Sequence, residues 1–258
     1  MANYKCVSRA GTTEFSKVRP CLKGRKDTSI VIPTYKEEEN IEKLVEGLHK
    51  VLQGADYEII IVDDSSPDRT PEIIDRLAGK TEAGSGETVA LHRGTRGIFS
   101  AVQDGVAISR GETIVFMDAD FSHPPDVVPR LLEYKDEFDI VSASRFAKGG
   151  KLIAPRIHWL LSKVLNRVCE IFLWLPVKDL TGGFHAIKRS KLDEIKFKYN
   201  SQWGEFDLEL FYRAKKKGFK IKEIPFVYKF RDFGTAKSND FMYGWKYLSM
   251  LIKLRLFG

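Results

Sequence analysis

The sequence is poor in cysteine: its 258 residues include three, Cys6, Cys21 and Cys169, and no two of them form a C-x-x-C pair. An odd number of widely spaced cysteines argues against a disulfide framework and against a zinc site, and it is typical of a reducing compartment. Long apolar runs are missing too. Because no stretch of 18 uncharged apolar residues occurs, the sequence predicts no transmembrane helix.

Two common glycine-rich phosphate-binding motifs, G-x-x-x-x-G-K-[ST] and G-x-G-x-x-G, are also absent, which disfavours a P-loop or dinucleotide-binding fold. The 42 Lys and Arg residues exceed the 35 Asp and Glu residues. The net charge of +7 suits an anionic partner such as nucleic acid, a phosphorylated substrate or an acidic lipid surface. Since no basic and aromatic nucleic-acid-binding motif accompanies this charge, we expect no nucleic-acid partner.

Continuous apolar runs alternate with amphipathic segments from residue 28 onward. The runs predict strands at 28–35, 57–64, 88–93, 112–118 and 138–146. The amphipathic segments predict helices at 36–52, from Pro71, around 98–109 and at 204–218. This alternation is typical of an α/β fold with a mainly parallel central sheet covered by helices on both faces. In such sheets ligands bind beyond the carboxyl ends of the strands.

Polar clusters follow three of the predicted strands, in the segments PTYKEEEN, DDSSPD and DADFSHPP. Loops collect charge in any protein, but three strand-then-acid arrangements favour a binding site at this edge. Asp118 and Asp120 are two residues apart, so a strand would place both carboxylates on one side. Such a pair suits a hard cation, Mg²⁺ or Mn²⁺, that also contacts substrate phosphates. The alternative is a pair of solvated turn acids, which the nearby Asp63, Asp64 and Asp68 make less attractive.

Seven segments carry a resemblance to a known family. They are IVIPTYKEEENI, IIIVDDSSPDRT, GIFSAVQDGV, FMDADFSHPP, FDIVSASRF, DLTGGFHAIKRS and IKEIPFVYKFRDFGTAKS. They occur in the order seen in family 2 glycosyltransferases, and most resemble the dolichol-phosphate mannosyltransferases of that family. The likeness covers about residues 28–238. It implies a GT-A (Rossmann-like) α/β domain whose first half binds a nucleotide-sugar and whose second half supplies the acceptor side.

The resemblance also implies a donor site. The base and ribose are expected to contact Pro33, Tyr35, Glu37 and Asp64. Asp118 and Asp120 are expected to hold the divalent cation on the diphosphate. Ser122 stands at the third position of that metal cluster, where related enzymes often have Gln, and a serine hydroxyl is a weaker ligand than an amide oxygen. In the segment YKFRDFGTAKS, Arg231 and Lys237 are expected to close over the diphosphate.

The acceptor phosphate is expected to be held by Arg145, Arg156, His158 and Ser162. In the family a serine lies four residues after an arginine. Counting back four from Ser162 gives His158 rather than Arg156, so the register of this site stays open. The resemblance makes Asp120, Arg145 and Arg231 the catalytic residues.

The implied reaction is an inverting, metal-dependent transfer of mannose from GDP-mannose to dolichyl (polyprenyl) phosphate. It would take place at the cytoplasmic face of a membrane, to which the protein binds peripherally. The resemblance leaves open whether a membrane-embedded partner subunit is also involved. One alternative keeps the fold but uses UDP-glucose or another nucleotide-sugar, or a glycan hydroxyl as acceptor. Another is a nucleotide-sugar-binding subunit without activity, which the presence of the metal acids and Arg231 disfavours.

We divide the chain into a basic flexible arm (1–27), the GT-A catalytic domain (28–238) and a C-terminal amphipathic helix (239–258). The arm lacks the apolar stretch of a secretory signal. The C-terminal helix combines aromatic and basic residues in a way that suits the headgroup region of a membrane, with an ordinary packing helix as the alternative. The apolar segment at 157–176 carries its charges on one face, so it is typical of either a core helix or an interfacial one.

Overall fold

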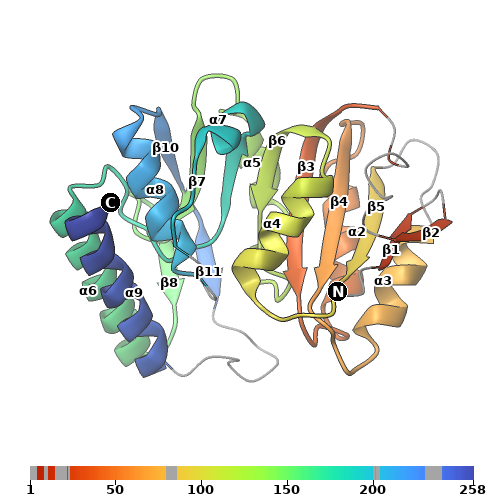
Figure 1. The fold of residues 1–258 in the computed structure, drawn as a ribbon, viewed down its shortest axis with the longest axis horizontal. Coiled ribbons are helices and arrows are strands. Elements are labelled where there is room, and N and C mark those ends of the chain that lie inside the picture. Colours follow the sequence, from red (N-terminus) through yellow and green to blue (C-terminus); the bar gives the residue numbers. More distant parts are fainter. Residues whose placement is uncertain are drawn as a thin grey trace.

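The computed structural model describes residues 5–8, 11–14, 22, 24–79, 86–199, 201, 204–229 and 240–258. Its strands are β1 (Lys5–Ser8), β2 (Gly11–Glu14), β3 (Lys26–Thr34), β4 (Tyr57–Asp63), β5 (Glu87–His92), β6 (Gly111–Phe116), β7 (Ile140–Ser144), β8 (Lys151–Ile153), β9 (His185–Lys188), β10 (Ile221–Pro225) and β11 (Val227–Lys229). A nine-stranded sheet in the order β10-β7-β9-β6-β3-β4-β5-β1-β2 forms the centre of the molecule (Figure 1). β8 and β11 pair separately as a small two-stranded sheet.

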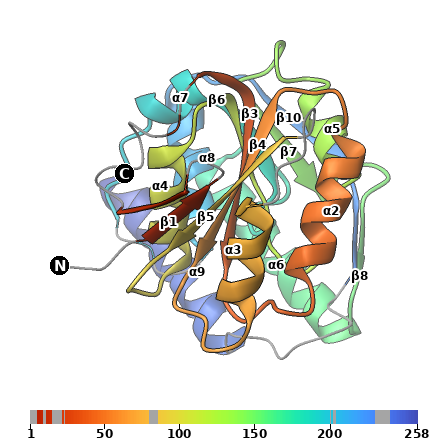
Figure 2. The ribbon, with the colours of Figure 1, turned by 90° about the vertical axis from the view of Figure 1, so that its right-hand side faces the viewer.

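Helices lie on both faces of the large sheet. They are α2 (Ile41–Val51), α3 (Thr70–Gly79), α4 (Ile98–Ile108), α5 (Val127–Leu132), α6 (Arg156–Leu173), α7 (Arg189–Glu194), α8 (Phe206–Lys216) and α9 (Asp240–Phe257). Apolar side chains of α2, α3 and α5 belong to one core cluster, and those of α4, α7 and α8 belong to the other. Figure 2 shows α2 and α4 on opposite sides of the strands.

The strand directions confirm the predicted α/β architecture with a mainly parallel sheet. β3 runs parallel to both β4 and β6, β4 runs parallel to β5, and β7 runs parallel to β10. Two features were not predicted. β9 runs antiparallel between β6 and β7. β1 and β2 add an antiparallel edge to β5, within residues 1–27, where the sequence predicts a flexible arm.

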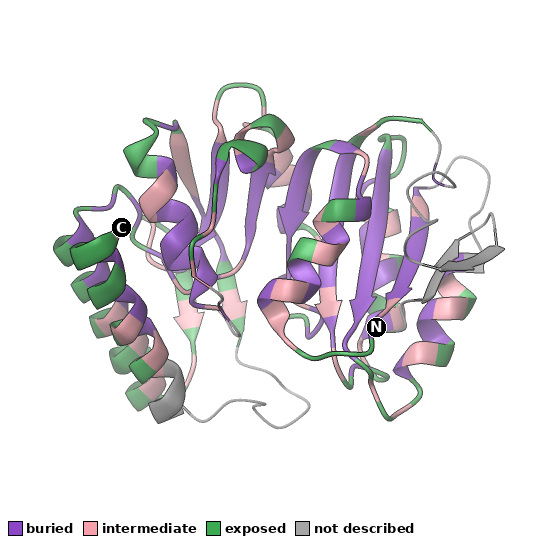
Figure 3. Cartoon of the chain, viewed as in Figure 1, coloured by how far each residue is buried: buried purple, intermediate pink, exposed green. Residues whose placement is uncertain are grey.

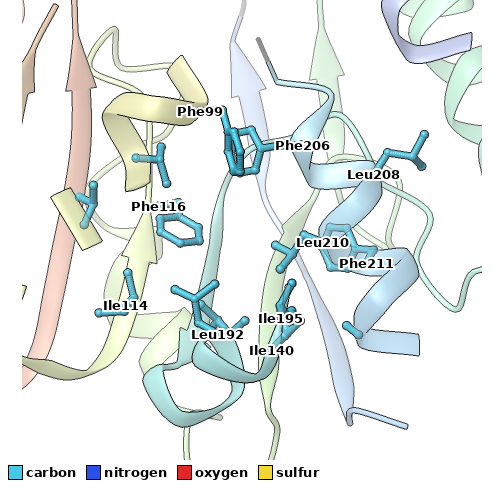
Figure 4. Close-up of a cluster of buried hydrophobic side chains, with 14 of the residues drawn as sticks. Phe99, Ile114, Phe116, Ile140, Leu192, Ile195, Phe206, Leu208, Leu210 and Phe211 are labelled. Carbon is cyan, nitrogen blue, oxygen red and sulfur yellow. The ribbon is translucent and has the colours of Figure 1, made fainter. Parts of the chain in front are cut away.

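Side chains alternate between the two faces along the central strands. Val31 of β3 belongs to the cluster that contains α4 and α8, whereas Ile30 and Ile32 belong to the cluster that contains α2 and α3. All residues of β4 are buried, because helices cover this strand on both faces. Figure 4 shows Phe99 of α4 against Phe206 of α8, with ring centroids 5.1 Å apart. This contact joins the first half of the chain to the second.

Gly105 allows α4 to lie close on the sheet. A Cβ atom at this position would come within 2.5 Å of Val31 Cγ1 on β3 and 3.0 Å of Val62 Cγ2 on β4. Only glycine is therefore compatible with this separation of helix and strands. The close packing fixes the start of α4, and the loop before it, at the carboxyl edge of the sheet.

α2 begins at Ile41 instead of residue 36, where the sequence predicts the helix to start. Lys36 has a φ of 56°, so its left-handed backbone ends the extended chain without beginning a right-handed helix. The N–H groups of Asn40 and Ile41 both donate to the carbonyl of Glu37 in the turn that follows. This turn keeps residues 35–40 at the edge of the sheet.

α6 and α9 lie side by side at the end of the molecule opposite β1 and β2 (Figure 1). α9 packs on α6 and α8 through Tyr247, Met250, Leu251 and Leu254, which are at most 4% exposed. The Tyr247 hydroxyl donates to the carbonyl of Gly204 at 2.6 Å. One side of the C-terminal helix is therefore a packing surface, which agrees with the alternative of an ordinary packing helix for that side. Among the described residues, no helix is long and apolar enough to cross a bilayer.

Candidate functional site

The carboxyl ends of β3, β4 and β6 meet at one edge of the sheet, because these strands are parallel neighbours. Lys36, Ser65 and Phe121 lie just beyond these three ends with positive φ angles of 56°, 58° and 61°. Left-handed backbone is uncommon outside glycine and costs roughly 1–3 kcal/mol per residue. Three such residues at one edge indicate that the surrounding structure holds these loops in strained backbone conformations. The predicted donor-site residues lie in or next to the same loops.

Asp64, which follows β4, belongs to a buried network with Arg93, which follows β5. Arg93 Nη1 donates to Asp64 Oδ1, and Arg93 Nε donates to Asp104 Oδ2 at 2.8 Å. The N–H of Gly97 donates to Asp64 Oδ2 at 2.7 Å, and the φ of 147° at Gly97 is one that glycine adopts readily. Burial raises the pKa of Asp64, while the Gly97 N–H and Arg93 oppose that rise. Asp64 thus anchors the loop that leads into α4.

Tyr35 lies beside the same loop. The guanidinium carbon of Arg96 is 3.8 Å from the Tyr35 ring centroid, which is a cation–π contact. Arg96 is exposed, and the residue after it, Gly97, is the one that binds Asp64. The structure therefore brings the predicted donor residues Tyr35 and Asp64 together around one loop.

The other two predicted donor residues are Pro33, which is half-buried, and Glu37, which is buried. Pro33 lies within β3, where it pairs with Val62 of β4. Glu37 is 8% exposed, and its Oε2 accepts a hydrogen bond from Asn40 Nδ2 at 2.8 Å. The carboxylate of Glu37 thus supports the turn before α2.

Asp118 and Asp120 lie in a loop beyond β6, which ends at Phe116, and not on the strand. The alternation of a strand therefore does not explain their approach; the left-handed Phe121 turns the chain directly after Asp120. Asp120 is 8% exposed, and its Oδ1 accepts the N–H of Ser122 at 3.0 Å. The side chain of Asp118 is 47% exposed. The loop thus combines an inner and an outer carboxylate.

His123 supports this loop from the interior. Its Nδ1 accepts the backbone N–H of Asp118 at 2.8 Å, which leaves the ring proton on Nε2. His123 Nε2 lies 3.9 Å from Asp118 Oδ2. The buried imidazole stacks on Phe184 with ring centroids 4.5 Å apart. His123 therefore fixes the backbone that presents Asp118.

The hydroxyl of Ser122 lies in the same loop. Ser122 is 1% exposed, and within the described part of the chain its Oγ has no hydrogen-bond partner. A buried hydroxyl of this kind is suited to a ligand or an ordered water. No three His, Cys, Asp or Glu side chains gather into a metal site among the described residues. The oxygens of this loop therefore offer part of a coordination shell, which suits Mg²⁺ when water and substrate phosphates supply the rest.

Arg145 follows β7 and is held in a rigid arrangement. Its Nε and Nη2 donate to the two carboxylate oxygens of Asp179 at 2.8 and 2.6 Å, and Nη2 also donates to Thr181 Oγ1 at 2.6 Å. Thr181 Oγ1 accepts a further hydrogen bond from Asn166 of α6 at 2.9 Å. Arg145 is 8% exposed. The bidentate pair pre-organises the guanidinium and connects β7 to α6.

A pocket of about 410 Å³ opens beside Arg145. It is lined by Arg145, Phe146, Gly150, Lys151, Leu152, Ile153, Trp159 and Lys163. This lining contains three cations and no acid. The ammonium of Lys163 lies 4.7 Å from the ring centroid of Trp159. Positive and apolar walls together suit an anion that is attached to an apolar chain.

Among the residues predicted for the acceptor phosphate, Arg145 lines this pocket, and Arg156, His158 and Ser162 do not. Arg156 is exposed, and His158 and Ser162 are half-buried, in the first turns of α6. Lys163 is the neighbour of Ser162, and a step of one residue turns a helix by about 100°. Arg231 and Lys237, predicted to close over the diphosphate, lie outside the described residues.

Four side chains that shape these two sites were not predicted: Arg93, His123, Lys151 and Lys163. Arg93 is the last residue of the predicted strand at 88–93, as Asp64 and Asp118 are the last residues of theirs, so the rule that found these acids also applies to it. His123 follows the D-x-D pair by three residues. Lys151 and Lys163 meet only through the packing of β8 near α6, which no local sequence pattern indicates.

Solved structures share this fold. Glucosyl-3-phosphoglycerate synthase from Mycobacterium tuberculosis, in complex with Mn²⁺, UDP and glucosyl-3-phosphoglycerate, matches with a TM-score of 0.66 and 18% identity, over 93% of this chain and 83% of that chain. The same enzyme in complex with Mg²⁺ and UDP matches with a TM-score of 0.64. The fold is thus the predicted GT-A fold.

The sequence places the chain more closely. Residues 29–196 match the model of glycosyl transferase family 2, and the chain belongs to that family. Dolichol-phosphate mannosyltransferase of Pyrococcus furiosus is 36% identical over 213 residues, which cover 81% of this chain and 58% of that protein. Polyprenol monophosphomannose synthase of Mycolicibacterium smegmatis is 33% identical over 219 residues, which cover 82% of this chain and 81% of that protein. The chain thus spans little more than half of the first relative.

Proposed function

We propose that the chain transfers mannose from GDP-mannose to dolichyl phosphate or another polyprenyl phosphate, with inversion at the sugar C1. The names of two relatives support mannose as the sugar and a polyprenyl phosphate as the acceptor. The observation that carries the proposal is the pairing of an acidic loop, at Asp118 and Asp120, with a basic and apolar pocket beside Arg145.

The two sites are neighbours in the sheet. β9 lies between β6 and β7 and is antiparallel to both, so β6 and β7 point the same way and end at the same edge. Two strand spacings amount to about 10 Å. In an in-line displacement the attacking and the leaving oxygen lie on opposite sides of the sugar C1, so the two phosphate sites have to be close neighbours of this kind. A diphosphate at the acidic loop and an acceptor phosphate in the pocket would therefore face the same sugar from opposite sides.

The proposed cofactor is Mg²⁺ or Mn²⁺. Asp118 and Asp120 would hold it, and the buried hydroxyl of Ser122 would bind it directly or through a water, since these cations prefer oxygen ligands. When bound, the cation neutralises charge on the departing nucleoside diphosphate. The similar folds that contain Mn²⁺ or Mg²⁺ beside UDP support this choice.

Residues of the first half would position the donor. Tyr35 and Asp64 border the loop before α4, and the network around Arg93 keeps Asp64 in one orientation. A nucleotide base and ribose at this place would direct the diphosphate toward Asp118 and Asp120. Pre-organisation of this kind lowers the entropic cost of bringing the reactants together.

Residues of the second half would position the acceptor. Arg145, Lys151 and Lys163 would bind its phosphate, with Arg145 held in place by Asp179. A phosphate monoester has a second pKa of about 6, so at neutral pH its oxygen attacks without a general base. The new bond to C1 forms as the bond from C1 to the GDP oxygen breaks, which inverts the anomeric centre. Arg231 and Lys237 keep their proposed role at the leaving diphosphate.

We place the reaction at the cytoplasmic face of a membrane, with the chain bound peripherally. The proposed acceptor is a lipid, so its phosphate lies at the headgroup level, while its donor is water-soluble. Peripheral binding is sufficient for this geometry.

Donor identity can be tested by thermal unfolding of the full chain with GDP-mannose, UDP-glucose and the free diphosphates, each with and without Mn²⁺. A ligand that binds only the folded state raises the apparent stability. We expect the largest rise with GDP-mannose and Mn²⁺, followed by transfer of labelled mannose to a polyprenyl phosphate. If only UDP-glucose stabilises the protein, the donor is UDP-glucose and not GDP-mannose. If a glycan hydroxyl is a better acceptor than a polyprenyl phosphate, the proposed acceptor is wrong.

Lys163→Met is expected to raise KM for a short, water-soluble polyprenyl phosphate by about tenfold, because a charged hydrogen bond to phosphate contributes roughly 1.5–3 kcal/mol. The Kd for GDP-mannose should not change. Steady-state kinetics and donor titration measure the two effects. Lys178→Met is the matched control, since Lys178 is exposed and does not line the pocket. An unchanged acceptor KM would remove Lys163 from the acceptor site.

A further inference from the structure

The guanidinium of Arg145 lies against two aromatic rings as well as a carboxylate. Asp179 binds one edge of it through Nε and Nη2, and hydrogen bonds along one edge resist a tilt of the guanidinium plane less than a shift within that plane. The central carbon of the guanidinium is 5.3 Å from the ring centroid of Tyr228 and 5.4 Å from that of Phe146. A cation over a ring is attracted by the negative face of the ring. The two rings therefore restrain the tilt that Asp179 leaves.

Tyr228 reaches Arg145 from the small sheet that β8 and β11 form. Tyr228 of β11 pairs with Leu152 of β8, and both are half-buried, whereas the residues on either side of each are exposed. Figure 3 shows this small sheet in the exposed and intermediate colours, unlike the buried central strands. Alternation along the strand thus turns Tyr228 inward. Tyr228 does not itself line the pocket, so it acts on the pocket through Arg145.

The ring of Tyr228 is itself held by the core. It packs against the apolar cluster that contains Phe226 and Phe184. The ring centroids of Tyr228 and Phe226 are 6.4 Å apart with an interplanar angle of 78°, and those of Phe226 and Phe184 are 5.8 Å apart with an angle of 85°. Edge-to-face contacts of this kind hold aromatic rings in defined orientations. Because its own orientation is fixed, the Tyr228 ring can orient the cation beside it.

We propose that Tyr228 is a positioning residue for the acceptor: its ring orients the Arg145 guanidinium toward a phosphate in the adjacent pocket. The inference rests on the proposed function, because it takes a polyprenyl phosphate as the ligand of this pocket. A ring suits the task better than a second carboxylate. Asp179 already offsets the charge of Arg145, whereas a ring orients a cation without adding negative charge. Lys151 and Lys163 therefore keep the pocket positive for an anion.

The test changes the electrons of the ring and keeps its shape. In the full chain, Tyr228→Phe is compared with the same variant carrying one, two or three fluorine atoms on the phenylalanine ring, and with Tyr228→Leu. Each fluorine withdraws electron density from the ring face and weakens its attraction for a cation. Titration calorimetry without donor measures the Kd of a short, water-soluble polyprenyl phosphate. We expect Tyr228→Phe to bind like wild type, each fluorine to raise the Kd, and Tyr228→Leu to raise it about tenfold.

Two controls accompany this series. The thermal unfolding temperature and the Kd for GDP-mannose with Mn²⁺ should not change along the fluorinated variants, because the ring keeps its size. Tyr134 is the matched position: it is half-buried, its ring centroid lies 5.1 Å from the ammonium of Lys222, and it does not line the pocket. The same fluorinated series at Tyr134 should leave the acceptor Kd unchanged.

Three outcomes decide the matter. If the acceptor Kd does not respond to the fluorine atoms while mannose is transferred normally, the positioning role of Tyr228 fails and the proposed function stands. If the acceptor Kd rises with the fluorine atoms in a protein that transfers mannose to no acceptor, the proposed function fails and the positioning role stands. Equal losses of acceptor and GDP-mannose binding in Tyr228→Leu, without a response to fluorine, would show that Tyr228 only supports the fold and would overturn the proposal.

Discussion

Asp120→Asn is expected to lower the rate of mannose transfer by roughly a thousandfold while the protein keeps its fold. A bound cation contributes several kcal/mol to the stabilisation of charge on the leaving diphosphate, and each ~1.4 kcal/mol is a factor of ten in rate. The substitution removes one cation ligand and one negative charge. The asparagine retains an oxygen that can accept the Ser122 N–H, which Asp120 Oδ1 accepts at 3.0 Å, so the loop keeps its shape.

Single-turnover rates at saturating donor, over a range of Mn²⁺ concentrations, measure this loss. Stabilisation by GDP with Mn²⁺ in thermal unfolding should fall with it, which separates a cation defect from a purely catalytic one. Asp126→Asn is the matched control: Asp126 is exposed in the same segment, and its side chain makes no capping hydrogen bond to α5. Near-normal rates for Asp120→Asn at low Mn²⁺ would show that the acidic loop does not bind the cation.

The central strands could be predicted because their signal is local. A strand buried on both faces reads as a continuous apolar run, as in YEIIIVD, and the run itself ends where β4 ends. β9 has four residues, and it pairs with β6 and β7 only because the chain reverses before it. β1 and β2 are as short, and their pairing with each other and with β5 is a tertiary event. Short strands of this kind carry too little periodicity to be read from sequence.

The acidic loop was predicted by a partly mistaken argument. Asp118 and Asp120 were placed on one side of a strand, but β6 ends before them and a left-handed Phe121 shapes their turn. The predicted location of Asp118 and Asp120 depends on a more general rule: the loops at the carboxyl ends of parallel strands lie at the same edge of the sheet. On the acceptor side, Lys151 and Lys163 line one pocket only because β8 lies near α6 in the folded chain. No local sequence pattern could therefore predict that these two side chains share a site.

The orientation of α6 illustrates a further limit of periodicity. The spacing of apolar residues shows that a helix has two unlike sides, but it does not show which side faces the protein. The sequence therefore left a core helix and an interfacial helix as equal alternatives. The contacts of Asn166 with Leu180 and Thr181 fix which side of α6 faces the protein, and they join residues 14 and 15 positions apart in the chain.

Arg93→Met is expected to lower the free energy of unfolding by about 3–5 kcal/mol at neutral pH, because it leaves the buried carboxylate of Asp64 and the half-buried carboxylate of Asp104 without their cation. Arg93 is 4% exposed and donates to both. The same change frees the loop before α4, so GDP-mannose should also bind more weakly. Urea unfolding and donor titration measure the two effects. Arg69→Met, which removes an exposed arginine at the same edge, is the matched control.

The pH dependence of this deficit distinguishes its cause. Burial raises the pKa of Asp64 above its ordinary value of 3.8, and Arg93 is among the groups that oppose the rise. Without the guanidinium the pKa rises further in the native state only, so between 3.8 and that raised pKa the native protein holds more protons than the unfolded chain. Stability then falls as the pH rises through this window and returns as the pH falls. The deficit of Arg93→Met relative to wild type should therefore narrow from neutral pH toward about pH 4. A deficit that is constant with pH would assign the effect to lost packing of the arginine and not to the unpaired carboxylates.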